Sequence, residues 1–386
     1  MGCMSSPSSI RLSKSCIGQE EKDAVAKVLD KEFLGMGEEV LEFERLLEEF
    51  FGRPCVCVAN GTAALHLALQ AVGIGPGDEV LVPSLTYLAS FQAISAAGAT
   101  PVACDVEEGN CLLSLKDAAG RITSRTKAVM PVFYAGQTGD LNGFHAFARN
   151  YGLRVIEDAA HAFGSKFGGK RIGSFGDISC FSFDGIKNIT SGEGGCLVSD
   201  DPSVLSKARD ARLLGVENDS RKRAQNLRSW SFQVNEQGWR YHMSNLMAAI
   251  GIVQLGRFEF LARKRVHLAE TYLRLIKPFC GADGIIIPIH SKLDQCVPHI
   301  FPIRVMGMNY RDRLLQYMKQ YGVELGLHYQ PNHLLNLYRK DTASPLTITE
   351  KIYPELLSLP LHPDLSEDDC ELIVKHLIEG LRLSSV

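Results

Sequence analysis

The sequence predicts an α/β fold built around a mainly parallel central sheet. Short runs of continuous apolar residues, typical of buried strands, alternate with segments whose apolar residues recur at helical spacing. Most of these segments are joined by short turns, as expected when helices cover both faces of a parallel sheet. We expect a large α/β domain over residues 1–250 and a smaller α+β domain over residues 251–386.

Composition narrows the possible partners. The chain has 386 residues, 45% of them hydrophobic, which is enough for two domains with separate cores. Lysine and arginine number 41 against 44 acidic residues, so a formal charge of -3 predicts neither nucleic acid nor a membrane as partner. The eleven cysteines lack metal-binding spacing. We expect them to be reduced, in a cytoplasmic protein that binds no metal.

The first part of the chain alternates between helices and strands. Val40, Phe43, Leu47 and Phe50 recur every three or four residues and predict an amphipathic helix over residues 38–51. The patterns that follow predict strands over 55–59, 79–83, 100–104, 127–132 and 153–157, and helices over 63–72, 86–97 and 143–151.

The second part is less regular. Residues 207–228 carry mixed charges and suggest a mobile, solvated connection. Ser244 suits the N-cap of one long helix that runs to about residue 275. The remaining predicted elements are strands over 178–183, 195–199 and 297–305, and helices over 310–321 and 367–381.

Polar residues and glycines gather where the predicted strands end. Gly61 and Thr62 follow the strand over 55–59 and open a helix, whose free N–H groups suit a phosphate, although Thr62 is equally suited to be an ordinary helix cap. Asp158 ends a second apolar run, and Lys187 follows a third. Ligands collect at the carboxyl ends of parallel strands, so we expect these residues to converge.

A lysine and a buried carboxylate at such an edge suit an aldehyde cofactor with a basic ring nitrogen. The amine of Lys187 can form a Schiff base with the aldehyde, and Asp158 can keep a pyridine nitrogen protonated. Pyridoxal phosphate carries both groups and a phosphate. Taken singly, Lys187 is better explained as an exposed loop residue and Asp158 as a helix cap or an ion-pair partner, so only their joint placement carries the prediction.

Neighbouring residues complete this cofactor site. Ala160 is small enough for a flat ring to lie against it, and Tyr87 can stack on the opposite face, although it is equally suited to a core. Backbone amides and hydroxyls of Gly61, Thr62 and Ser182 would hold the phosphate.

Seven segments in matching order carry a resemblance to a known family. They are residues 60–67, 75–80, 83–87, 155–161, 182–190, 192–195 and 328–331. These segments resemble the DegT/DnrJ/EryC1/StrS family, and the resemblance extends from about Ile10 to Leu381. It implies the aspartate-aminotransferase fold, fold type I of the pyridoxal-phosphate-dependent transferases. Members of the family act largely on nucleotide-linked keto sugars.

The resemblance implies a role for several residues. Lys187 corresponds to the catalytic Schiff-base lysine, Asp158 to the partner of the pyridinium nitrogen, and His161 to a residue near the phenolic oxygen of the cofactor. The implied reaction is ping-pong: glutamate gives its amino group to the cofactor, which then aminates a keto sugar. The further implied cofactor contacts are Gly61, Thr62, Tyr87 and Ser182.

One segment departs from the family pattern. Many relatives carry Asn-aromatic-Arg-Met-Ser before the long helix, and the Asn reaches the cofactor phosphate of the partner subunit. Here Arg240 stands at the Asn position and His242 at the Arg position. Arginine pairs with phosphate or carboxylate, so we expect Arg240 to contact the cofactor phosphate or an acidic group of the substrate. The segment also implies a homodimer with shared active sites.

Two other functions remain open at this point. A pyridoxal-phosphate-dependent sugar dehydratase would share most of these residues. The dehydratases of the family carry histidine in place of the lysine, so Lys187 argues against this function. A non-enzymatic regulator that retains the fold would bind cofactor without consuming glutamate, and the intact Lys187, Asp158 and Ser182 argue against it. Candidate contacts to the sugar are the loop 35–37, Tyr134, His328 and Tyr329.

Overall fold

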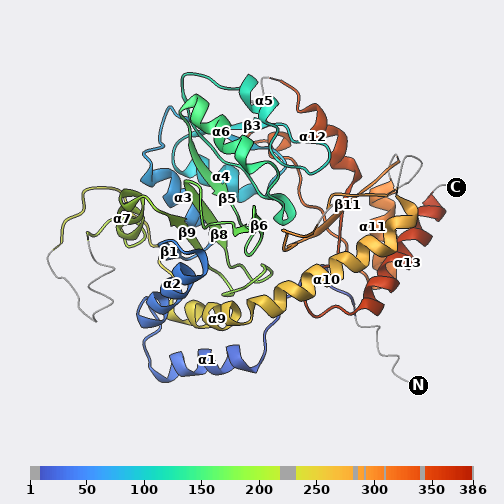
Figure 1. Cartoon of the computed structure of the whole chain (residues 1–386), viewed down its shortest axis with the longest axis horizontal. Helices are drawn as coiled ribbons and strands as arrows, with labels where there is room; N and C mark the ends of the chain where they lie inside the picture. Colours follow the sequence, from blue (N-terminus) through green and yellow to red (C-terminus); the bar gives the residue numbers. More distant parts are fainter. Residues whose placement is uncertain are drawn as a thin grey trace.

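The centre of the molecule is a seven-stranded sheet (Figure 1). The computed structural model describes residues 9–217, 232–280, 286–290, 293–307, 310–339 and 344–384. The strands of the sheet lie in the order β1-β9-β8-β5-β4-β2-β3. Their bounds are β1 (Cys55–Val58), β2 (Glu79–Pro83), β3 (Thr100–Cys104), β4 (Thr126–Val129), β5 (Arg154–Asp158), β8 (Ile178–Ser182) and β9 (Gly195–Ser199).

Strand direction confirms the predicted mainly parallel sheet. The pairs β2–β3, β2–β4, β4–β5 and β5–β8 are parallel. Only β9 runs against the other strands of this sheet, since it pairs antiparallel with both β8 and β1. A two-stranded hairpin, β6 (Lys166–Phe167) and β7 (Lys170–Arg171), lies outside the sheet.

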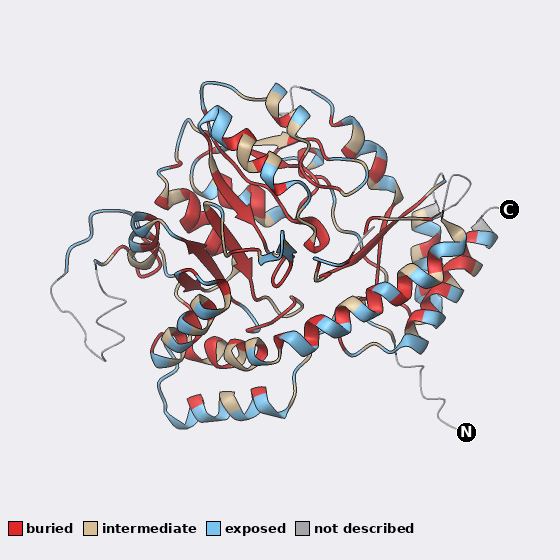
Figure 2. Cartoon of the chain, in the orientation of Figure 1, coloured by how far each residue is buried: buried red, intermediate tan, exposed pale blue. Residues whose placement is uncertain are grey.

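Helices cover both faces of the sheet. Alternate residues of a strand face opposite sides, and in β1 Cys55 and Cys57 join one hydrophobic cluster while Val56 and Val58 join another. The first cluster includes residues of α2 (Glu38–Phe51) and α6 (Leu141–Tyr151). The second includes residues of α3 (Gly61–Ala71), α4 (Leu88–Ala96) and α7 (Pro202–Ala211). Figure 2 accordingly shows the strands buried along most of their length.

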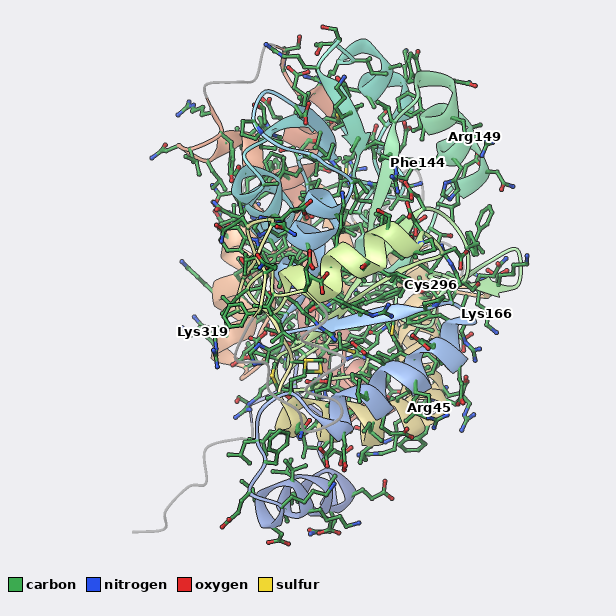
Figure 3. The ribbon with its side chains drawn as sticks, turned by 90° about the vertical axis from the view of Figure 1, so that its left-hand side faces the viewer. Arg45, Phe144, Arg149, Lys166, Cys296 and Lys319 are labelled. Carbon is green, nitrogen blue, oxygen red and sulfur yellow. The ribbon has the colours of Figure 1, made fainter. Side chains whose placement is uncertain are left out.

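The amphipathic pattern of these helices agrees with their placement. On α2, Arg45 lies on the outer surface and Phe43 is buried (Figure 3). On α6, Phe144 is buried against the sheet and Arg149 is exposed, as the same view shows. Two helices were not anticipated from apolar spacing, α5 (Leu115–Gly120) and α12 (Thr347–Ile352), and both are only six residues long.

The prediction of a solvated connection is wrong for its first residues. Residues 207–211 belong to α7, which begins at Pro202 with Asp201 as its N-cap. Val204, Leu205 and Ala208 are buried on its inner face. The charges between these residues conceal their helical spacing. Residues 212–217 follow the helix, and Arg212 and Leu213 among them are buried. The remainder of the predicted connection, over 218–228, falls outside the described residues.

The predicted long helix is two helices. The first, α9 (Asn245–Gly256), and the second, α10 (Phe258–Ile276), are bent by 65° relative to each other. Arg257, between the two helices, forms an ion pair with Glu21 of α1 (Gln19–Asp30), so the bend is connected to a third helix. No single helix of the described residues is long and apolar enough to cross a membrane, and the bent pair passes only on length and composition.

A second sheet and core lie toward the C-terminus. Strands β10 (Ile286–Pro288), β11 (Phe301–Val305) and β12 (Leu356–Leu359) form an antiparallel sheet. Side chains of α10, α11 (Tyr310–Gln320) and α13 (Glu367–Ser384) pack on it in a cluster of their own. Figure 1 shows α10 running from the central sheet to this second one. We keep the division of the chain at residue 250 as a proposal.

Candidate active site

Several predicted site residues lie at the carboxyl ends of strands that run in the same direction. Gly61 and Thr62 follow β1, Asp158 ends β5, and Ser182 ends β8. Lys187 lies in the loop from β8 to β9. Because β1, β5 and β8 point the same way, these ends meet at one edge of the sheet, as the sequence predicted.

Asp158 is a buried carboxylate that two donors hold. Ser90 Oγ of α4 donates to its Oδ2 at 2.7 Å, and the N–H of Ala160 donates to Oδ1 at 3.2 Å. Burial raises the pKa of Asp158 above its ordinary value, while these two hydrogen bonds and the charge of Lys187 oppose the rise. The side chain is therefore poised to accept a hydrogen bond from a cationic ring nitrogen.

Lys187 is held near a second basic side chain. Its Nζ lies 3.4 Å from Nε2 of His299, a buried residue that precedes β11. Burial lowers the pKa of Lys187 to about 8, against the opposing charges of Asp184 and Asp158. Burial also holds the pKa of His299 well below its ordinary value, so His299 is neutral and its Nε2 can accept a hydrogen bond from the amine.

His161 is the centre of an aromatic group beside the lysine. Its ring lies 4.4 Å from that of His299, centroid to centroid. Its Nδ1 accepts from the N–H of Ala135 at 3.3 Å, which places the proton of the neutral ring on Nε2, 3.0 Å from the hydroxyl of Tyr329. Tyr87 stands 5.5 Å from the Tyr329 ring and is 59% exposed, so one of its faces is free for a flat ligand.

Gly61 and Ser182 converge at the start of α3. A Cβ on Gly61 would lie 2.8 Å from Cβ of Ser182, so no larger residue fits without a shift. Asn60, not Thr62, is the N-cap of α3, and its Oδ1 accepts from the N–H of Ala63 at 2.8 Å. The N–H groups of Gly61 and Thr62 have no partner inside the helix, and the Ser182 hydroxyl is beside them. An N-terminus without its own acidic residue and a neighbouring hydroxyl suit a phosphate. With the buried carboxylate and the lysine at the same edge, the residues fit pyridoxal phosphate.

Arg240 lies apart from these residues. Its backbone pairs with Leu213, and its neighbours Trp239 and Tyr241 pack beside His66 of α3. The Arg240 side chain is exposed, and no hydrogen bond or ion pair joins it to another described residue of the same chain. The structure therefore does not bring it to the site of its own subunit.

The candidate sugar contacts divide into two groups. Tyr134 donates from its hydroxyl to the carbonyl of His328, and Tyr329 contacts His161, so all three lie beside the site. The loop 35–37 is held instead at the start of α9, where Asn245 Oδ1 accepts from the N–H of Gly37 at 2.8 Å.

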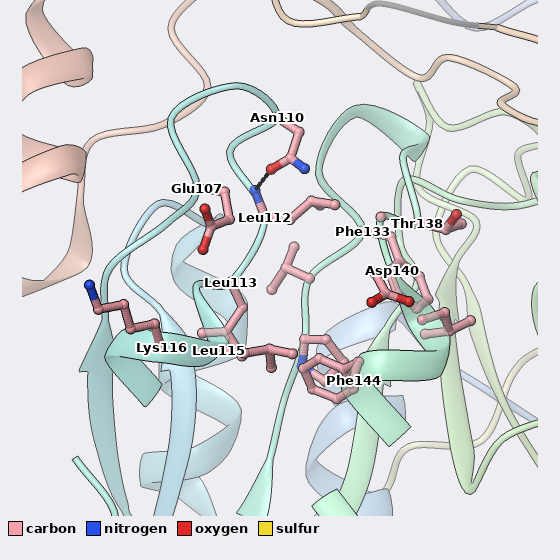
Figure 4. Close-up of a pocket in the computed structure, with 14 residues that line it drawn as sticks. Glu107, Asn110, Leu112, Leu113, Leu115, Lys116, Phe133, Thr138, Asp140 and Phe144 are labelled. Carbon is pink, nitrogen blue, oxygen red and sulfur yellow. Dashed lines mark hydrogen bonds between the residues drawn. The ribbon is translucent and has the colours of Figure 1, made fainter. Parts of the chain in front are cut away.

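A separate pocket of about 250 Å³ lies near the end of β4 (Figure 4). Leu112, Leu113, Phe133 and Phe144 form its apolar walls, with charged residues at the rim. It contains none of the predicted site residues. The pocket is therefore distinct from the strand edge that carries Lys187.

Sequence reasoning missed three residues of the site. Ser90 donates a hydrogen bond to Asp158, and His299 contacts Lys187. Arg265 of α10 donates to the backbone carbonyls of His299 and of Ile186, which precedes Lys187. A small polar residue inside the apolar helix over 86–97 was the only local signal for Ser90. His299 and Arg265 reach the site only because the C-terminal part folds back onto the central sheet.

Comparison with known proteins gives a consistent result. The model of the DegT/DnrJ/EryC1/StrS aminotransferase family matches residues 15–378. Spore coat polysaccharide biosynthesis protein SpsC of Bacillus subtilis is 34% identical over 367 residues, 93% of this chain and 94% of SpsC. Helicobacter pylori PseC, an aminotransferase involved in the biosynthesis of pseudoaminic acid, superimposes with a TM-score of 0.88 at 26% identity, over 97% of this chain and 100% of PseC. The PLP form of the sugar aminotransferase Spr1654 of Streptococcus pneumoniae gives a TM-score of 0.87 at 26% identity, over 97% and 99%.

Proposed function

Because the chain belongs to the DegT/DnrJ/EryC1/StrS aminotransferase family, we propose that it moves the amino group of glutamate onto a nucleotide-linked keto sugar. It is an aminotransferase with pyridoxal phosphate as its cofactor. SpsC is a spore coat polysaccharide biosynthesis protein, PseC is an aminotransferase involved in the biosynthesis of pseudoaminic acid, and Spr1654 is a sugar aminotransferase, which supports a sugar as the acceptor. The observation that carries the proposal is the placement of the half-buried Lys187 and the buried Asp158 at one edge of the sheet.

Lys187 is the proposed acid and base. Pyridoxal phosphate supplies an electron sink that stabilises negative charge on the carbon bearing the amino group. With a pKa of about 8, Nζ of Lys187 is uncharged in an appreciable fraction of molecules near neutral pH and can take a proton from that carbon. His299 Nε2, 3.4 Å away, accepts a hydrogen bond from the amine and keeps it pointed into the site.

The other site residues bind and orient. Asp158 would hold the proton on the ring nitrogen, with Ser90 and Ala160 fixing its carboxylate. Tyr87 would stack on the ring, and His161 would contact its phenolic oxygen. Phosphate binding is proposed for Gly61, Thr62 and Ser182.

We also propose a homodimer in which Arg240 serves the partner's site. Its side chain is exposed, while its backbone is fixed by bonds on both neighbours: Trp239 N–H donates to Ala211 O at 2.6 Å and Tyr241 N–H to Arg212 O at 3.0 Å. An exposed guanidinium on a fixed backbone suits an anion on a second subunit.

The two half-reactions test the function separately. The protein loaded with pyridoxal phosphate should convert glutamate to 2-oxoglutarate, and then add an amino group to a nucleotide-linked keto sugar, as shown by the product mass. Lys187→Ala should abolish both steps, while Lys170→Ala, which removes an exposed lysine of β7, should leave them unchanged. Amination by Lys187→Ala at the wild-type rate would contradict the proposal. Loss of water from the sugar would favour the dehydratase, and inertness toward glutamate the regulator.

A further inference from the structure

Arg265 is a buried cation that joins three segments at the site. Its side chain, on α10, is only 2% exposed. Nη1 donates to the carbonyl of His299 at 3.1 Å and to that of Leu361 at 3.2 Å, and Nη2 donates to the carbonyl of Ile186 at 3.3 Å. Ile186 directly precedes Lys187, so one guanidinium group links the backbone of the lysine loop to the backbone of its histidine neighbour.

No carboxylate neutralises this charge within the described ranges. Arg265 forms no ion pair there, and its Nε has no acceptor among the same residues. Carbonyl oxygens satisfy some of its five donors but do not cancel its charge. A buried, unpaired arginine costs folding free energy, and methionine or leucine would fill the same space at lower cost. The position therefore calls for an explanation beyond packing.

We propose that Arg265 is a positioning residue for the reaction, which holds the Lys187 loop against His299 and keeps an uncompensated positive charge beside the reacting amine. The inference rests on the proposed function, because it takes Lys187 to be that amine. The rigid fork of the guanidinium group suits this task, since it bonds two segments at fixed angles where a flexible ammonium would hold one.

The charges around Lys187 set how much Arg265 matters. Asp158 on β5 and Asp184 in the lysine's own loop raise the pKa of the amine, whereas Arg265 lowers it. The three facing histidines are neutral, because burial lowers the pKa of His161 and His299 well below the ordinary value and that of His328 to about 4.

Among the described residues, the other titratable groups that face Arg265 are uncharged. The thiol of Cys16 is neutral, since burial raises its pKa above the ordinary value. The two other neighbours are His299 and His362, and burial lowers the pKa of both. Arg265 thus supplies a positive charge that favours an uncharged lysine.

The test measures the pKa of Lys187 without turnover. Apo-protein is labelled with acetic anhydride across a pH series, and modification of Lys187 is followed by peptide mass against Lys170 in the same sample. In the wild type, half-maximal labelling of Lys187 should fall near pH 8 and that of Lys170 near the ordinary lysine value. Arg265→Met and Arg265→Gln should shift the Lys187 midpoint upward, toward the ordinary lysine value, which leaves less uncharged amine to react at neutral pH.

A charge-conserving variant separates position from charge. Arg265→Lys should keep the midpoint within about 0.3 units but lower kcat, because the fork that binds His299 and Ile186 is lost. Arg274→Met, an exposed arginine on the same helix, should change neither. A wild-type midpoint near the ordinary lysine value, or a folded neutral variant with an unchanged midpoint, would overturn the inference. If the midpoints shift as expected but no keto sugar is aminated, only the proposed function fails.

Discussion

Ser90 Oγ donates a 2.7 Å hydrogen bond to Oδ2 of Asp158, across 68 residues of sequence. Ser90 lies in the first turn of α4, and Thr86 Oγ1 lies 3.0 Å from the same hydroxyl. The contact with Thr86 therefore orients the serine hydroxyl toward Asp158. The bond stabilises the charged form of a carboxylate whose burial favours the neutral form. Binding of a cationic ring nitrogen needs that charge.

Ser90→Ala is expected to raise the pKa of Asp158 and to weaken cofactor binding by about tenfold, the loss of one hydrogen bond to a charged group. Fluorescence titration with pyridoxal phosphate measures the dissociation constant. The loss should be larger at low pH, where Asp158 is more readily protonated. Ser95→Ala, on the same helix but 3.3 Å from the Tyr338 hydroxyl, is the matched control. Equal affinity for wild type and Ser90→Ala would show that the bond has no influence on the cofactor.

Gly61→Ala is expected to disrupt the phosphate end of the site. The added Cβ would lie 2.8 Å from Cβ of Ser182, and relieving such overpacking costs about 1 to 3 kcal/mol. Cofactor affinity should fall at least tenfold, measured as above. Gly120→Ala at the end of α5 meets no atom within 4 Å and should bind cofactor normally. Unchanged affinity in Gly61→Ala would place the phosphate elsewhere.

Lys187→Met is expected to stabilise the apo-protein below pH 8. The pKa of Lys187 is about 8 in the folded chain and about 10.5 in the unfolded one, so folding below pH 8 requires burial of a charge. The variant avoids this penalty, about 3 kcal/mol for a difference of about 2.5 pKa units at about 1.4 kcal/mol per unit. Its advantage should shrink as pH rises from 8 to 10.5. Urea denaturation at several pH values measures it, with Lys170→Met as control, and an advantage independent of pH would contradict the lowered pKa.

Mixed dimers test the shared site. Arg240→Ala alone should lose about tenfold or more in activity, because charge-assisted hydrogen bonds to an anion are lost. If Arg240 serves the partner, a heterodimer of Lys187→Ala and Arg240→Ala subunits has one intact site and recovers about half of wild-type activity. Differently tagged, co-expressed subunits provide that heterodimer. No recovery would mean that Arg240 acts within its own subunit.

Much of the central sheet could be predicted because its signals are local. Strands β2, β3 and β9 coincide with their predicted bounds, since each is a continuous apolar run between turn residues. The bend between α9 and α10 could not be predicted in this way. Gly256, a poor helix former, directly precedes Arg257 and is only a weak local signal for a break. The ion pair of Arg257 at the joint is with Glu21, 236 residues away.

The residues of the candidate site also differ in whether the local sequence predicts them. Gly61, Asp158 and Lys187 were found because each follows an apolar strand, and strand direction brings them together. His299 and Arg265 have no such signal. Their roles depend on the contact between the C-terminal part and the lysine loop, which is decided by tertiary packing.

The reversed direction of β9 has a consequence for how the chain assembles. Because β8 and β9 are antiparallel neighbours, the Lys187 loop is closed by short-range bonds, such as Phe183 N–H to Gly194 O at 2.8 Å. Closing a short loop loses less chain entropy than closing a long one, and local contacts form fastest. We expect the lysine hairpin to form early in folding, and the carboxylate that faces it to arrive only when the long parallel crossovers close.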